Sequence, residues 1–306
     1  MPSLPRPAAA DSRHAIFLVL ASVALFAVFD STVKVLGQIA PMAMVLWVRY
    51  AFQVGLTLLT AGPRQRRQLF VTHRPGLQLA RGLALLSMSA LAFLSLQHMP
   101  VGEFTAIVML TPLLITFLAA TLLGETVSRL RWALLGVGLA CALLVIRPQG
   151  GQASAAVIYP LLLVVAGAAF HVLSSQLSRT ENSSTTQLFT GMVGLLVMTA
   201  FLPGQWQALD ARTWALLGVA GALSSGGHFL LILAYARASA ATLTPYLYFQ
   251  IAFATLAGGL LFGHIPDALA LTGIVGIAFC GALGTWITAH ESRRAMEALR
   301  TALPPD

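Results

Sequence analysis

Apolar runs of roughly 20 residues recur along the whole chain, and this feature limits the fold more than any other. Each run is long enough to cross a hydrocarbon core of about 30 Å as an α-helix. Only 9% of the 306 residues are charged, whereas a soluble domain carries about 25%. A transmembrane β-barrel would instead show alternating segments of about 10 residues. We therefore predict an all-α integral membrane protein.

Ten such runs can be delimited, because short connections rich in Pro and Gly separate them, as at Pro41, Pro100 and Gly263. The fifth and seventh runs are shorter than the others, and we expect them to extend into their loops. The predicted transmembrane helices cover residues 15–37, 42–61, 77–97, 104–123, 132–147, 157–177, 187–203, 214–235, 242–262 and 268–289.

Basic residues are concentrated on one side of the predicted spans. Only Arg147 and Arg212 fall in loops on the other side. Because Lys and Arg mark cytoplasmic loops, we expect both tails, residues 1–14 and 290–306, in the cytoplasm, which agrees with an even number of spans. The net charge of +8 lies in short loops and forms no stripe. We therefore expect the lipid bilayer as a partner and no nucleic acid.

The two halves of the chain are weakly similar to one another. Residues 104–124 match residues 243–263, and Gly124 lies 139 positions before Gly263. Each half holds five predicted spans, and this odd number forces the second half to enter the membrane from the opposite side, as in inverted-repeat transporters. We predict two inverted five-helix repeats around a central cavity, with residues 15–147 as the first repeat, 148–156 as a linker and 157–289 as the second repeat.

Segments 81–125 and 221–263 resemble the paired modules of the EamA branch of the drug/metabolite transporter superfamily. The resemblance covers nearly the whole chain and includes Arg81, Thr111-Pro112 and Gly227-His228. It implies a basket of helices in a bacterial inner membrane, with alternating access to a central cavity. The resemblance is greatest to bacterial amino-acid and metabolite exporters, and relatives in the branch take up S-adenosylmethionine or riboflavin.

Three charged residues, Asp30, Lys34 and Arg49, fall inside the first two predicted spans. At a rise of about 1.5 Å per residue, Asp30 lies roughly 6 Å and Arg49 roughly 4 Å to the outer side of their own span centres, so their depths match. A lone charge in hydrocarbon is costly, so these residues need partners. We expect either a structural ion pair or an outer gate that clamps an anionic group of the substrate. A proton-carrying role for Asp30 is a third interpretation.

Polar and aromatic side chains in other spans are candidates for lining the cavity. Phe29-Asp30 matches Phe170-His171 at a spacing of 141 positions, which places Asp30 and His171 at opposite ends of one cavity. Interhelical packing remains the alternative for every candidate. The predicted cavity residues are Ser89, Phe93, Gln97, His171, His228, Tyr246, Tyr248 and Gln250, and the predicted helix kinks are at Pro112 and Pro245.

No nucleotide-binding, zinc-protease or redox motif is present, and Cys141 and Cys280 lie isolated in apolar runs. We therefore expect no cofactor, no metal and no enzymatic activity. The predicted function is secondary transport of a small molecule, first of all amino-acid export, with uptake of a metabolite or cofactor as the alternative. A channel and a membrane enzyme acting on a lipid-linked substrate stay as further alternatives, although the scattered acids argue against the enzyme. A monomer is compatible with these features.

Overall fold

The computed structural model describes residues 9–62, 69–122, 129–146, 155–177, 180–235, 237, 243 and 246–302. These described residues form helices and short connections, and no strand occurs among them. The helices are α1 (Ala9–Leu36), α2 (Met42–Thr60), α4 (Pro75–His98), α5 (Val101–Val108), α6 (Thr111–Leu122), α7 (Arg129–Ile146), α8 (Ile158–Leu177), α9 (Ser183–Phe201), α10 (Ala211–Tyr235), α12 (Phe249–Phe262) and α13 (Ala268–Ala302), with 3₁₀ turns η1 (Ala155–Val157) and η2 (Leu202–Gly204).

Helix length and hydropathy agree with membrane insertion. Five helices, α1, α2, α4, α9 and α10, contain stretches long and apolar enough to cross a bilayer, and five further apolar stretches are shorter. Large apolar side chains are exposed on the outer surface, including Leu59, Leu260 and Val165. Such a surface suits lipid and not water. The prediction of an all-α membrane protein is confirmed.

Three predicted spans differ most from the observed helices. The tenth was expected to end at residue 289, whereas α13 continues to Ala302. The fourth is divided, since α5 ends at Val108 and α6 begins at Thr111. Pro112 is the second residue of α6, where its missing N–H removes no helical hydrogen bond. The ninth was expected from residue 242, whereas α12 begins at Phe249. The predicted kink at Pro245 lies outside the described residues.

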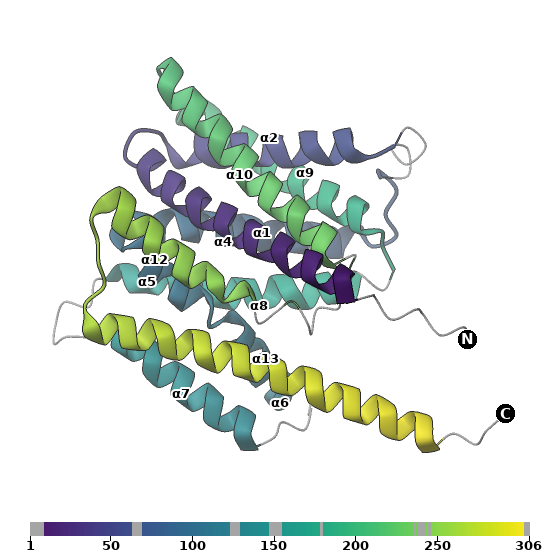
Figure 1. The fold of residues 1–306 in the computed structure, drawn as a ribbon. Coiled ribbons are helices and arrows are strands. Elements are labelled where there is room, and N and C mark those ends of the chain that lie inside the picture. The colour runs from purple at the N-terminus through teal and green to yellow at the C-terminus, as the bar shows by residue number, and fades with distance from the viewer. Residues whose placement is uncertain are drawn as a thin grey trace.

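The helices pair across the two predicted halves (Figure 1). Helix α1 packs on α10 and α4 packs on α8, while α10 also contacts α2 and α4 also contacts α9. In the predicted repeat, α1 corresponds to α8, α2 to α9 and α4 to α10. The α1–α10 pair therefore corresponds to α8–α4, and the α2–α10 pair corresponds to α9–α4. The α1–α12 pair corresponds to the contacts of α8 with α5 and α6, and the pairs α2–α9, α5–α12 and α7–α13 map onto themselves. An internal repeat would produce this pattern, although most of the predicted linker, residues 148–154, lies outside the described ranges.

Helix α1 begins and α13 ends at the same end of the bundle, here called the terminal end (Figure 1). Residues 37–41, which connect α1 to α2, lie at the opposite end, here called the far end. The central core draws buried side chains from α1, α2, α4, α5, α8, α10 and α12. Small residues permit close helix contacts there. Gly194 of α9, for example, lies directly against the ring of Tyr50 on α2.

Candidate functional site

Arg49 of α2 stands at the centre of a polar cluster inside the bundle. Its Nε donates a hydrogen bond to Ser224 Oγ at 3.1 Å, and its Nη1 donates to Ser89 Oγ. The guanidinium carbon lies 5.2 Å from the centre of the Phe29 ring and 5.6 Å from that of Tyr50. One side chain therefore connects α1, α2, α4 and α10. Arg49 is seven residues past the start of α2, about 10 Å from the far end.

The groups around Arg49 are neutral hydroxyls. Tyr50 is fully buried, and its hydroxyl lies 2.9 Å from Ser89 Oγ, which itself donates to the main-chain oxygen of Leu85 at 2.8 Å. No carboxylate among the described residues lies within 4.0 Å of the guanidinium. An arginine in a membrane-spanning segment without a directly bound carboxylate is a candidate for a functional residue.

Asp30 lies near this cluster but makes a different contact. The residue is only 8% exposed, and its Oδ2 accepts a hydrogen bond from Gln250 Nε2 of α12 at 3.5 Å. The direct ion pair expected between Asp30 and Arg49 does not form, and the two charges interact only at longer range. The physical reason is the direction of Arg49. Stacking on Phe29 and the two serine hydroxyls turn its guanidinium toward α4 and α10.

His228 of α10 joins the cluster through the backbone. Its Nδ1 lies 2.8 Å from the main-chain oxygen of Ser224, one turn earlier, and its ring meets Phe26 edge-on at 4.9 Å. The neighbouring Gly227 allows this approach, because a Cβ at that position would lie 2.8 Å from the Phe26 ring. Ser22 of α1 donates to the Gly227 oxygen at 2.7 Å. Helices α1 and α10 are thus held together beside Arg49.

The Lys34 side chain contacts the end of α4 and not Asp30. Its ammonium donates to the main-chain oxygens of Leu96 at 2.8 Å and Met99 at 2.6 Å. Both oxygens lie at the end of α4, where carbonyls lack intrahelical partners and a positive charge favours the helix dipole. Lys34 therefore caps α4, and the predicted grouping of Lys34 with Asp30 in one gate is not what the contacts show.

The other predicted cavity residues divide into three groups. Ser89, His228 and Gln250 lie in the cluster described above. Phe93 and Tyr248 are packed in apolar cores, and the buried Tyr248 hydroxyl has no hydrogen-bond partner among the described residues. Tyr246 packs against α1 and α10, and Gln97 lies against Gly37 near the far end. His171 lies elsewhere, beside a second arginine. These packing positions correct the expectation that all eight residues line one cavity.

That second arginine is Arg81 of α4, which sequence reasoning did not identify as a site residue. Its Nε donates to Ser174 Oγ at 2.7 Å, and its Nη1 donates to Thr190 Oγ1 and to the Thr186 oxygen at 3.3 Å. The guanidinium carbon lies 4.4 Å from the centre of the Phe170 ring. Its place inside a predicted span, the same signal that identified Arg49, could have revealed it.

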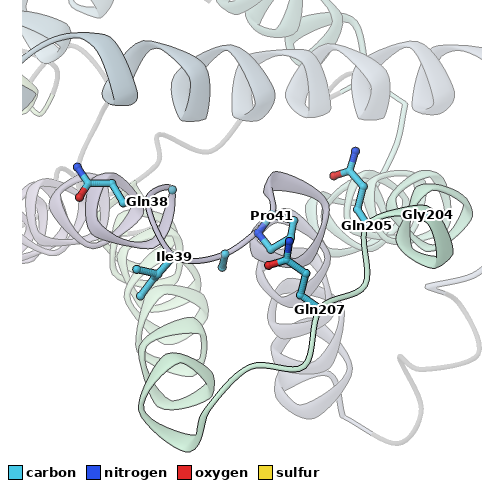
Figure 2. A pocket seen from close by; sticks show the side chains of 8 residues that line it. Gln38, Ile39, Pro41, Gly204, Gln205 and Gln207 are labelled. Atoms are coloured by element: carbon cyan, nitrogen blue, oxygen red, sulfur yellow. The ribbon is translucent and has the colours of Figure 1, made fainter.

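A cavity of about 470 Å³ opens at the far end of the bundle (Figure 2). It lies between the α1–α2 connection and the segment after η2, and Gln38, Gln205 and Gln207 contribute its polar side chains. Its lining residues carry no charge. This recess gives a polar, neutral surface at the end toward which Asp30 and Arg49 lie.

Comparisons with known proteins agree with a transporter. No family model matches the chain. The chain is 28% identical over 229 residues to a riboflavin transporter of Rhizobium johnstonii, covering 73% of each chain. It is 26% identical to a riboflavin transporter of Vibrio cholerae, covering 83% of this chain and 86% of the relative. It is also 26% identical to the pseudopaline exporter CntI of Pseudomonas aeruginosa, covering 83% of this chain and 89% of the relative.

A solved crystal structure has the same fold. It covers 90% of this chain and 98% of its own with a TM-score of 0.64, at 14% identity. That likeness concerns the fold alone. Because the three relatives are named as transporters or exporters, the comparisons indicate a multi-pass membrane transporter for a small molecule.

Proposed function

We propose that the protein is a secondary transporter that carries small zwitterionic metabolites, first of all amino acids, by alternating access. The observation that supports this is the separation of Asp30 from Arg49. The two opposite charges interact electrostatically, yet they are not within 4.0 Å of one another. An amino acid carries a carboxylate, which can bind to Arg49, and an ammonium group, which can bind to Asp30.

Each group in the cluster has a role in this proposal. Arg49 binds the carboxylate, since no hydrogen bond to a described residue uses its Nη2 and a guanidinium binds carboxylates through two parallel hydrogen bonds. Ser89 and Ser224 hold the guanidinium in place. Asp30 binds the ammonium group, and Gln250 orients the Asp30 carboxylate. Phe26, Phe29 and His228 provide the apolar wall that a ligand site requires.

Alternating access follows from the way the helices pair. We assign the chain to the EamA branch, with residues 15–147 and 157–289 as inverted repeats, in the inner membrane with both tails cytoplasmic. Each repeat packs chiefly on the other through α1–α10, α4–α8 and α2–α9. Rocking of one repeat against the other then opens the cluster first to one side and then to the other. No ATP-binding motif is needed for this mechanism.

Riboflavin is the second candidate substrate. Two relatives that match most of the chain are named riboflavin transporters. The aromatic rings of Phe26, Phe29 and His228 lie beside hydrogen-bonding groups, and such a surface also suits a flat polar ring. This candidate uses the same cluster but does not need Arg49 as a carboxylate ligand.

A flux assay separates these candidates. The purified full chain is reconstituted in liposomes, and uptake of labelled amino acids and of labelled riboflavin is measured separately, with and without a pH gradient. We expect saturable amino-acid uptake with counterflow. Riboflavin flux that is unchanged in Arg49→Gln would establish the second candidate. Non-saturable flux without counterflow would indicate a channel, and no flux of any compound would refute the transporter proposal for these substrates.

A further inference from the structure

Two half-buried arginines stack on phenylalanines that are equivalent in the weak internal repeat. The Arg49 guanidinium lies over the Phe29 ring, and that of Arg81 lies over the Phe170 ring. Phe170 follows Phe29 by 141 positions, the spacing at which the two halves align. Each phenylalanine is followed by a titratable residue. The same three-part arrangement, an arginine on a ring with an ionisable neighbour, is therefore built twice.

The hydrogen bonds obey the same relation. Arg49 of α2 donates to Ser224 of α10, and Arg81 of α4 donates to Thr190 of α9. Exchange of the halves converts α2 into α9 and α10 into α4. The two contacts then join equivalent pairs of helices with donor and acceptor exchanged. Thr190 follows Arg49 by 141 positions, and Ser224 follows Arg81 by 143. The relation between the two arginines therefore extends beyond the aromatic rings.

The two arginines lie toward opposite ends of the bundle. Arg49 is seven residues past the start of α2, which begins at the far end. Arg81 is six residues past the start of α4, which begins at the terminal end. At about 1.5 Å per residue, each lies about 10 Å inside the bundle. The two arginines are therefore separated along the axis of the bundle.

Arg81, like Arg49, has a hydrogen-bond donor that no described residue uses. No carboxylate among the described residues lies within 4.0 Å of it, and no hydrogen bond to a described residue uses its Nη2. Its Nε and Nη1 are fixed by Ser174, Thr186 and Thr190, so the outer edge of the guanidinium is already oriented. A fixed, uncompensated guanidinium is suited to a carboxylate or another oxyanion.

Both arginines are half-buried, but the ionisable residues beside their stacking rings, Asp30 and His171, differ in exposure. His171 lies on the face of α8 that includes the buried Pro160, Val164 and Gly167, since these positions follow helical spacing, yet His171 itself is exposed. Its repeat equivalent, Asp30, is buried. This face of α8 is therefore buried as far as Gly167 and exposed at His171, toward the terminal end.

We propose that Arg81, Phe170 and His171 form a second binding station for the anionic group of the transported molecule, reached from the terminal end. The carboxylate contacts the free edge of Arg81, and it is then passed to Arg49 when the halves move. The identity of the transported molecule rests on the proposed function, whereas the anion preference of the station does not.

Thiol labelling tests the station without requiring transport. His171→Cys is made in a Cys141→Ala/Cys280→Ala background, and the full chain is reconstituted in neutral liposomes. Labelling rates are measured with an anionic sulfonatoethyl and a cationic trimethylammonioethyl methanethiosulfonate. We expect both reagents to react, the anionic one preferentially, and Arg81→Gln to lower the anionic-to-cationic rate ratio about tenfold. Arg81→Lys keeps the charge and should retain most of the preference.

Val172→Cys is the matched control, because it is adjacent on α8 and exposed on a different face. We expect little labelling there by either charged reagent. Size-exclusion profiles check that the Arg81 variants remain folded. Absence of labelling at position 171, equal labelling at 172, or a rate ratio that Arg81→Gln leaves unchanged would overturn the station, whatever the flux assay gives.

Protection separates this proposal from the proposed function. A mixture of the twenty L-amino acids should slow labelling at position 171 when Arg81 is present, and have no effect in Arg81→Gln. Protection supports both proposals. Anion preference without protection supports the anion station and counts against amino acids as the substrate.

Discussion

Gln250 directs its amide Nε2 toward Asp30 Oδ2 at 3.5 Å, and this contact joins α1 to the first turn of α12. The partner of the buried acid is therefore a neutral amide from the second half of the chain. Arg49 acts on this carboxyl group only through a longer-range electrostatic interaction. A substitution of Asp30 should therefore affect substrate transport more than folding.

Asp30→Asn should reduce the initial rate of transport at least about tenfold while the yield of folded protein stays close to that of the wild type. Asparagine preserves the side-chain volume and can still bond to Gln250, but it removes the charge assigned to the ammonium group. The measurement is initial uptake per amount of monodisperse protein in liposomes. Thr32→Val serves as control, because Thr32 bonds only within α1. Normal transport by Asp30→Asn would exclude the role of Asp30 in binding.

Arg49→Lys should raise KM for the transported substrate about tenfold or more, and Arg49→Gln should remove measurable transport. Lysine keeps the positive charge but cannot contact Ser89, Ser224 and a carboxylate in the same fixed plane. Concentration series of uptake for both variants give KM and kcat. If Arg49→Gln transported amino acids with an unchanged KM, the carboxylate-binding role of Arg49 would be wrong.

The sequence predicted the membrane fold well because span length and hydropathy are local properties. Its errors have tertiary causes. The break between Val108 and Thr111 sits inside one continuous apolar run, so hydropathy alone cannot place it. The depth argument brought Arg49 to the level of Asp30, but depth does not fix the direction of a guanidinium. That direction depends on Ser224, which is 175 residues away in the chain.

His228→Ala should weaken the apparent affinity for substrate in inside-out vesicles by several fold. The substitution removes the ring that packs edge-on against Phe26 and leaves the Ser224 carbonyl without its side-chain contact. His228→Phe keeps the ring packing and separates the two effects. Affinity restored in His228→Phe assigns the role to packing, and affinity lost in both assigns it to the ring nitrogen. Unchanged affinity and rate in His228→Ala would remove His228 from the site.

Lys34→Met should lower the thermal unfolding temperature without changing KM. Methionine keeps the apolar stem but cannot donate to the oxygens of Leu96 and Met99. Loss of hydrogen bonds from a charged donor costs about 1.5–3 kcal/mol. Thermal unfolding followed by fluorescence-detected size exclusion measures the effect, with Val35→Ala as an exposed neighbouring control. A raised KM with an unchanged unfolding temperature would instead return Lys34 to the gate.

Gly194→Ala should lower both stability and transport, although Gly194 contacts no group assigned to the substrate. A Cβ on this α9 residue would lie 2.6 Å from the Tyr50 ring, so the ring must move. Tyr50 bonds to Ser89, which in turn accepts from Arg49, so the displacement reaches the site through two hydrogen bonds. Overpacking of this kind costs about 1–3 kcal/mol.

Gly55→Ala on α2 is the matched control, because nothing lies within 4 Å of its added methyl. Unfolding temperature and KM measured for both variants, together with Tyr50→Phe, test the sequence of contacts. If Gly194→Ala lowered stability and left transport per folded protein unchanged, the connection from α9 packing to Arg49 would be disproved.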